Sequence, residues 1–265
     1  MRAAFVVALM LFCAPVFAQG VKLPSVTNSI GMELIEIPAG KFTMGDERIG
    51  VSVTLTQEFL LGKTEVTQGQ WKNVMRSEPW KGIGEGEQYV KADKDCPATY
   101  VSWNDATAFC KKLTAIERKA GTLKADEEYR LPTDAEWEYA CRAGTTTAYS
   151  FGDDESKLGE YAWFNGNTLK VNEPYAHRVG LKKSNPWGLH EMHGNVLEWC
   201  SDWYGEEPSG GVDPVGPKGG SFRVGRGGGW WSNPGSCRSA FRFSGVPSLR
   251  SDGLGFRVAP SQSAQ

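Results

Sequence analysis

The chain has 265 residues, of which 29 are Lys or Arg and 31 are Asp or Glu, so its net charge is −2. This balance gives no basic footprint for nucleic acid and is typical of a soluble globular protein. The chain also contains 32 glycines and 10 tryptophans, with no repeat pattern. Such a composition indicates a fold rich in turns and loops.

The N-terminal segment, residues 1–18, predicts an export signal. Arg2 precedes an apolar stretch that is too short to span a bilayer comfortably. Val16-Phe17-Ala18 places small residues where a signal peptidase cleaves. We therefore expect cleavage after Ala18 and a periplasmic or extracellular protein without a membrane segment, with an uncleaved anchor as the alternative. Residues 19–27 are expected to form a linker.

Regular elements are predicted mainly in the first half of the chain. Alternating apolar residues predict three short strands, over residues 34–40, 42–45 and 51–55. Three helices are predicted to follow the N-cap residues Thr67, Ser102 and Thr133, the last of which begins a capping box.

The second half has a different character. Residues 145–260 contain only short apolar runs, and Gly205–Gly229 holds 10 glycines. Turns and side-chain hydrogen bonds are expected to hold this part of the backbone. We expect one loop-rich α+β domain over residues 28–260 and a C-terminal tail over residues 261–265.

Nine short motifs occur along the chain in a fixed order. They are Asn28–Met32, Ile37–Gly45, Glu65–Thr67, Val101–Ala106, Arg130–Ala140, Asn185–Leu189, His193–Trp199, Arg226–Trp230 and Gly255–Arg257. The ordered set resembles the formylglycine-generating enzyme, or sulfatase-modifying factor, family. This resemblance implies a loop-rich variant of the C-type-lectin fold over nearly the whole mature chain.

The resemblance also implies a test for copper chemistry. The family's enzymes convert a sulfatase cysteine to formylglycine with O2 and a copper(I) ion held by two cysteines, because soft Cu(I) prefers thiolates. Counted from Gly227-Gly228-Gly229, the second cysteine corresponds to Cys237 and the first to Ser232. A serine hydroxyl cannot replace a thiolate on Cu(I), so the chain retains half of the pair.

Export would permit disulfides among the five remaining cysteines. We favour a disulfide between Cys200 and Cys237 as the structural explanation of Cys237. Cys110 and Cys141 match family disulfide positions whose partners are absent here, so these two either pair with each other or stay reduced. Cys96 would then be the odd thiol.

A calcium site is a second implication of the resemblance. The matching ligands are the side chains of Glu191 and Glu198 and the backbone carbonyls of Gly194 and Val196. This set of oxygen donors suits Ca²⁺. The alternative is a loop that hydrogen bonds close, with its carboxylates in solvent.

The segment Trp230–Arg242 stands where the family builds its substrate cleft. Its candidate ligand-binding residues are Trp230, Trp231, Asn233, Arg238 and Arg242. Aromatic faces and guanidinium groups suit the recognition of peptides or saccharides. Alternatively, the tryptophans fill a loop-rich core and the arginines pair with buried carboxylates.

Three functions follow from these observations. We favour an exported, non-catalytic member that binds a peptide, a protein such as a sulfatase, or a glycan through the Trp230–Arg242 region. The second is a formylglycine-generating oxidase. The third is a variable binding protein, because some proteins of this fold diversify the segment equivalent to Trp230–Ser251 by retroelement mutagenesis.

Overall fold

The computed structural model describes residues 22–261. Its three main helices begin at the predicted caps: α1 (Gln68–Met75), α2 (Trp103–Ala120) and α3 (Asp134–Arg142). Each cap side chain accepts a hydrogen bond from the third helical amide, and that residue's side chain bonds back to the cap. Helix α2 ends at Gly121, which has the positive φ that favours glycine.

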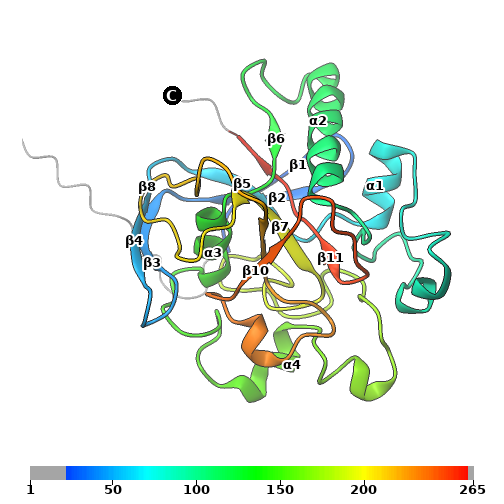
Figure 1. Cartoon of the computed structure of the whole chain (residues 1–265). Helices are drawn as coiled ribbons and strands as arrows, with labels where there is room; N and C mark the ends of the chain where they lie inside the picture. Colours follow the sequence, from blue (N-terminus) through cyan, green and yellow to red (C-terminus); the bar gives the residue numbers. More distant parts are fainter. Residues whose placement is uncertain (1–21, 262–265) are drawn as a thin grey trace, which may run out of the picture.

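The strands of residues 22–261 are short and form four small sheets, with the orders β1-β2-β5, β10-β9-β7-β11, β12-β6 and β3-β4-β8 (Figure 1). Their bounds are β1 Ser25–Thr27, β2 Glu33–Ile37, β3 Gly40–Met44, β4 Val51–Leu55, β5 Phe59–Gly62, β6 Tyr129–Arg130, β7 Leu197–Trp203, β8 Gly211–Val212, β9 Arg223–Arg226, β10 Arg242–Gly245, β11 Leu254–Gly255 and β12 Ala259–Pro260. The shorter helical turns are η1 Gly84–Tyr89, η2 Glu155–Lys157, α4 Leu158–Tyr161, η3 Leu169–Val171 and η4 Pro234–Cys237.

The three predicted strands are confirmed as β2, β3 and β4. The expected linker is wrong in its last part, because β1 lies there and pairs antiparallel with β2. The sheet of β7, β9, β10 and β11 was not predicted, since β9 reads Arg-Val-Gly-Arg and lacks an apolar alternation. The predicted signal segment lies outside the described residues.

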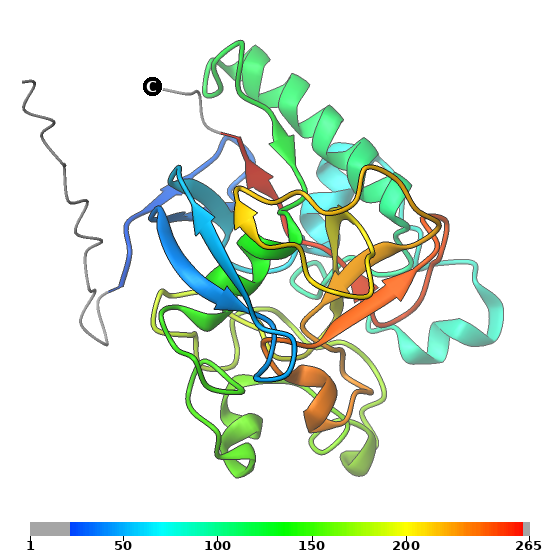
Figure 2. The ribbon, with the colours of Figure 1, turned by 60° about the vertical axis from the view of Figure 1, so that its left-hand side comes forward.

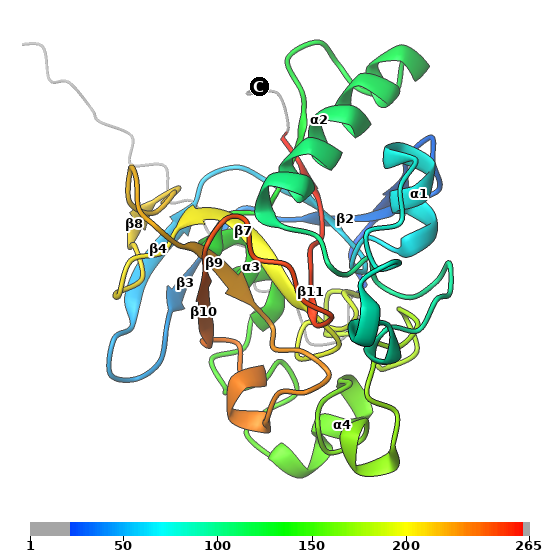
Figure 3. The same cartoon turned by 45° about the vertical axis from the view of Figure 1, so that its right-hand side comes forward.

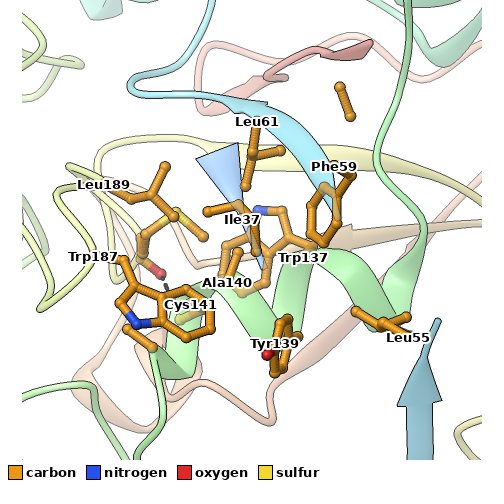
Figure 4. Close-up of a cluster of buried hydrophobic side chains, with 14 of the residues drawn as sticks. Ile37, Leu55, Phe59, Leu61, Trp137, Tyr139, Ala140, Cys141, Trp187 and Leu189 are labelled. Atoms are coloured by element: carbon orange, nitrogen blue, oxygen red, sulfur yellow. Dashed lines mark hydrogen bonds between the residues drawn. The ribbon is translucent and has the colours of Figure 1, made fainter. Parts of the chain in front are cut away.

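Two clusters of buried side chains form most of the core. In the first, Trp137 of α3 packs with Ile37 and Leu61 of the strands and with Trp187 (Figure 4). In the second, Phe109 of α2 lies 5.6 Å from the Trp71 ring of α1 and 5.3 Å from the Phe256 ring. Burying such rings supplies most of the hydrophobic stabilisation.

Part of the loop-rich second half gathers at one end of the molecule (Figure 3). The segment that contains η2, α4 and η3 lies with η4 on the side opposite α2 (Figure 3). The β3-β4-β8 sheet lies beside α3 (Figure 2). The loop-rich α+β class is therefore confirmed. No helix within residues 22–261 is long and apolar enough to cross a membrane.

Candidate binding surface and metal site

The Trp230–Arg242 segment does not form one open cleft, so this prediction needs correction. Trp230 is only 4% exposed, and its ring stacks on that of Tyr89 with 6.2 Å between centroids. The Arg242 side chain is 8% exposed and its Nε donates to Asp134 at 2.9 Å. Both side chains therefore hold the fold, as the alternative interpretation proposed.

The other predicted ligand residues remain at the surface. Trp231 is 41% exposed and its indole edge lies against Gly253, where a Cβ atom would clash with the ring. The Asn233 side chain accepts a hydrogen bond from the amide of Ser236 and so caps η4. Arg238 is exposed and donates to the Gly235 carbonyl. Trp231 is thus the one of these residues that presents a large apolar face.

Ser232 and Cys237 do not form a metal-binding pair. Ser232 is buried, and its hydroxyl accepts a 2.9 Å hydrogen bond from the amide of Gly229. Cys237 is fully buried, and burial raises the pKa of its thiol to about 12. This position therefore offers one thiol and a hydroxyl that accepts a backbone hydrogen bond, where Cu(I) prefers two thiolates.

The predicted disulfide between Cys200 and Cys237 is wrong. All five cysteines of residues 22–261 are free and buried. Cys200 lies in the cluster around α3, whereas Cys237 packs with Tyr149 and Leu158 in a separate, smaller cluster. Cys110 and Cys141 are also unpaired, so the reduced alternative holds for them. Cysteine counting cannot detect this, because a disulfide needs a specific separation of the two residues.

Arginines and carboxylates form a closed network around α3. The fully buried Arg226 guanidinium contacts Asp134 and Glu138, the latter at 2.8 Å. Arg142 donates to the other oxygen of Glu138, and Arg242 to the other oxygen of Asp134. Every oxygen of the two carboxylates is therefore paired with a guanidinium group, which is the condition under which buried charges are tolerated.

Three segments that meet at the buried Trp230 carry four exposed apolar side chains, and these define what we call the Trp231 surface. They are Tyr89, Leu169, Val171 and Trp231, which are 38%, 47%, 58% and 41% exposed. Thr168, directly before η3, donates to the Trp230 carbonyl at 2.6 Å, and Tyr89 stacks on the Trp230 ring. Three segments far apart in sequence thus meet at one place. Sequence reasoning found only Trp231 of these four residues.

The predicted calcium loop is built differently from the expectation. Both oxygens of Glu198 accept hydrogen bonds from Arg257, each at 2.6 Å, and both side chains are buried. Both oxygens of Glu191 lie 3.0 Å from the amide of Gly180. Glu191 has a φ of 55°, a left-handed conformation that Asn and Asp adopt more readily than Glu. Glycine is required at Gly194, where a Cβ would clash with the Trp163 carbonyl.

Glu65 is the residue that sequence reasoning missed. Its side chain is fully buried, Oε1 accepts a 3.1 Å hydrogen bond from Asn195, and Oε2 has no partner within residues 22–261. Burial and then the Glu191 carboxylate raise the pKa of Glu65 well above its usual value. Burial also raises the pKa of Glu191, to about 7. The signal in the sequence was the Glu65–Thr67 motif, but nothing there placed it against the loop.

These residues fit a hard cation in charge and donor type. Arg257 is the guanidinium partner of three carboxyl groups, those of Glu65, Glu191 and Glu198, so acidic groups outnumber the basic one. Glu65 Oε2 has no hydrogen-bond partner within residues 22–261. Residues 22–261 contain no group of three or more His, Cys, Asp or Glu side chains arranged to hold a metal. A cation here would therefore need backbone carbonyls as well, which Ca²⁺ accepts.

Asn195 connects the loop to the Trp231 surface. Its carbonyl accepts the amide of Trp230 at 2.8 Å, and its own amide donates to the Trp163 carbonyl at 2.7 Å. Its side chain bonds both Glu65 and the backbone of His177. Asn195 thus contacts both Glu65 and the backbone of Trp230.

Comparisons with known proteins agree with this architecture. The formylglycine-generating enzyme of Streptomyces coelicolor is 37% identical over 205 residues, which are 71% of this chain and 60% of that enzyme. The chaperone protein LppX of Paenibacillus barcinonensis is 26% identical over 244 residues, or 78% of this chain and 81% of LppX.

The solved structure of Treponema denticola variable protein 1 superimposes with a TM-score of 0.74 and 31% identity, covering 89% of this chain and 98% of that one. This chain therefore spans about 60% of the length of the Streptomyces enzyme but nearly all of the Treponema structure. The family model described as the sulfatase-modifying factor enzyme 1-like domain matches residues 22–262, and the chain belongs to this family.

Proposed function

We propose that this protein is a non-catalytic member of its family that binds a peptide segment of a protein partner through the Trp231 surface. Two adjacent residues carry the proposal. Trp231 has an exposed indole whose edge rests on Gly253, and Ser232 occupies the position of a copper-binding cysteine. The binding region is narrower than the sequence predicted, because Trp230 and Arg242 are structural.

The Trp231 surface has the properties of a binding hot spot. Trp231 is held against Gly253, and Tyr89 is held by its stack on Trp230, so both rings lose little entropy on binding. Leu169 and Val171 add two exposed apolar side chains on the segment whose Thr168 bonds to the Trp230 carbonyl. Clustered exposed apolar residues of this kind mark interaction sites more often than isolated ones do.

One relative supports a role in binding other proteins. LppX is described as a chaperone, and it matches this chain over most of both lengths. The formylglycine-generating enzyme of Streptomyces supports the oxidase alternative, but that reaction needs a copper site for which Ser232 and Cys237 are unsuited. The likeness to a variable protein supports the third candidate, and a near-copy of the coding segment for Trp230–Ser251 beside the gene would favour it.

The test starts from a random peptide library selected on the immobilised protein. The affinities of enriched peptides would then be measured for the wild type, Trp231→Ala and a control, Phe222→Ala, which removes another exposed aromatic ring. We expect Trp231→Ala to weaken binding by about tenfold or more, since a hot-spot side chain contributes over 1.4 kcal/mol. Enriched peptides whose affinity is unchanged in Trp231→Ala, or no enrichment at all, would contradict the proposal.

We also propose that Ca²⁺ binds in the loop, with Glu191 and the carbonyls of Gly194 and Val196 as ligands and Glu65 as an added carboxylate. Glu198 is assigned to Arg257 instead, because both of its oxygens are taken. Bound Ca²⁺ would supply positive charge that neutralises the excess of carboxylates. Terbium emission excited through tryptophan, and displaced by Ca²⁺, would support the site; absence of emission would count against it.

Export remains a proposal that rests on the N-terminal sequence. We expect the mature protein to begin at Gln19, which N-terminal sequencing of the protein recovered outside the cytoplasm would check. Recovery of the intact N-terminus from the cytoplasm would contradict it.

A further inference from the structure

A surface pocket of about 560 Å³ lies beyond the C-terminal end of α3, away from the Trp231 surface. Its wall includes the three consecutive threonines Thr145–Thr147, the rings of Phe151 and Tyr161, and Ser184. The volume falls within the range of roughly 300–1,000 Å³ that is usual for small-molecule sites.

The lining of this pocket carries hydroxyl, amide and aromatic groups but no charged side chain among the described residues. A second pocket of about 740 Å³ shares Thr146 and Thr147 but is lined by charged side chains of both signs, namely Asp46, Glu47, Arg48, Arg142, Asp153 and Arg238. The first pocket thus differs from its neighbour in having an uncharged lining.

The aromatic part of the wall is rigid. The rings of Tyr149 and Phe151 are stacked with centroids 4.9 Å apart and planes 6° apart, and Phe151 stacks on Tyr161 at 4.4 Å and 16°. Tyr149 is buried and its hydroxyl donates to the Pro234 carbonyl, which anchors the stack. Tyr161 therefore ends a fixed aromatic column, and the Lys183 ammonium lies 5.8 Å from its ring centroid.

The polar groups of the wall divide into two sets. Thr145 and Thr147 use their hydroxyls on the carbonyls of Arg142 and Tyr149, at 2.9 and 2.7 Å, and so fix the loop. The hydroxyls of Thr146, Ser184 and Tyr161 have no hydrogen-bond partner within residues 22–261 and are accessible to a ligand. The pocket thus offers preorganised, uncharged donors and acceptors beside aromatic carbon.

We propose that this pocket binds an uncharged saccharide. A sugar presents hydroxyls that match the free hydroxyls of Thr146, Ser184 and Tyr161, and C–H faces that pack against aromatic rings. The ammonium group of Lys183, 5.8 Å from the Tyr161 ring centroid, is already paired with Glu160 and the lining side chains carry no charge, so an anion finds no free counter-charge; a purely apolar ligand would leave the hydroxyls without partners.

Saturation-transfer NMR with a panel of neutral mono- and disaccharides, namely glucose, galactose, N-acetylglucosamine, maltose and lactose, tests the proposal. We expect at least one sugar to bind, and Tyr161→Ala and Ser184→Ala each to weaken it by about tenfold through the lost ring contact or hydrogen bond. Glucuronate is expected to bind more weakly than glucose. Tyr161→Phe keeps the ring stack and is expected to fall between the wild type and Tyr161→Ala.

Trp231→Ala serves as the matched control and is expected to leave sugar binding unchanged, so this result is independent of the proposed peptide binding. No saturation transfer from any of the five sugars at millimolar concentration would overturn the proposal. So would transfer that persists undiminished in Tyr161→Ala and Ser184→Ala, or that is lost in Trp231→Ala instead.

Discussion

The core contains two buried clusters of charged residues, and they differ in the ratio of guanidinium groups to carboxylates. Around α3, the oxygens of Asp134 and Glu138 are all paired with the guanidinium groups of Arg142, Arg226 and Arg242. Around the 191–198 loop, Arg257 is the guanidinium partner of an excess of carboxylates, and Glu65 Oε2 has no partner. The first cluster is electrostatically closed, whereas the second needs protons or a cation to become neutral.

The largest expected effect comes from breaking the closed cluster. Arg226→Ala would leave Asp134 and Glu138 short of a partner inside the core, so we expect a loss of about 3–5 kcal/mol in the free energy of unfolding. Urea denaturation measures this loss. Arg238→Ala, at an exposed site, is the control and should change stability by less than about 0.5 kcal/mol. Similar stabilities of the two variants would show that the cluster is not structural.

Calcium is the next largest effect and acts on the open cluster. If Ca²⁺ binds only the native state, a concentration 100 times its dissociation constant stabilises the protein by about 2.7 kcal/mol. Thermal melts with added Ca²⁺ and with chelator would therefore differ by several degrees. Identical melts would mean that the loop is closed by its hydrogen bonds alone.

Asp202, which neighbours Asp134 of the closed cluster, is expected to make the free energy of unfolding depend on pH. Burial, and then Asp134, raises the pKa of Asp202 to about 7 from an ordinary value near 3.8. Between about pH 4 and 7 the native state therefore holds a proton that the unfolded state has lost, so the stability present below about pH 4 is lost progressively as pH rises to about 7. Asp202→Asn removes this dependence.

Relative to the wild type, Asp202→Asn should gain up to about 1.4 kcal/mol per pH unit between pH 4 and 7. Urea titrations at several pH values in chelator measure the difference. A constant difference between the two proteins across this range would contradict the raised pKa.

The smallest expected effect is that of Glu65→Gln in chelator. The amide keeps an oxygen for Asn195 and removes a buried carboxyl whose second oxygen is unpaired, so stability should stay equal or rise by about 1 kcal/mol. The same variant should lose the thermal shift that Ca²⁺ produces. Glu33→Gln is the control, because it removes an exposed carboxylate that pairs with Lys63 at the surface, and it should keep that shift. A large destabilisation of Glu65→Gln in chelator would assign Glu65 a structural role.

The sequence predicted those features that depend on neighbours along the chain. The helices after Thr67, Ser102 and Thr133 were found because a cap residue and the apolar periodicity that follows it lie close together in the chain; the capping box was recognised only at Thr133, and the structure has one at all three. The family resemblance located the 191–198 loop and the 230–242 segment. It could not show that Trp230 is buried while Trp231 is exposed, since adjacent residues in an irregular loop follow no period.

Long-range pairings were the features that sequence reasoning missed. Glu198 meets Arg257 across 59 positions and Glu65 meets Asn195 across 130, so no local pattern could report either contact. The Cys200–Cys237 disulfide failed for the same reason, because the two thiols lie in different buried clusters. Where a loop-rich fold relies on distant polar pairs, composition reveals the residues but not their partners.

The central claim, that this family member binds without catalysing cysteine oxidation, has a direct test. The purified protein would be supplied with Cu(I) and incubated with a sulfatase-motif peptide under O2, and the peptide mass would be followed by mass spectrometry. Because the Ser232 hydroxyl stands where Cu(I) chemistry needs a thiolate, we predict an unchanged peptide cysteine. Conversion of that cysteine to formylglycine would contradict the account.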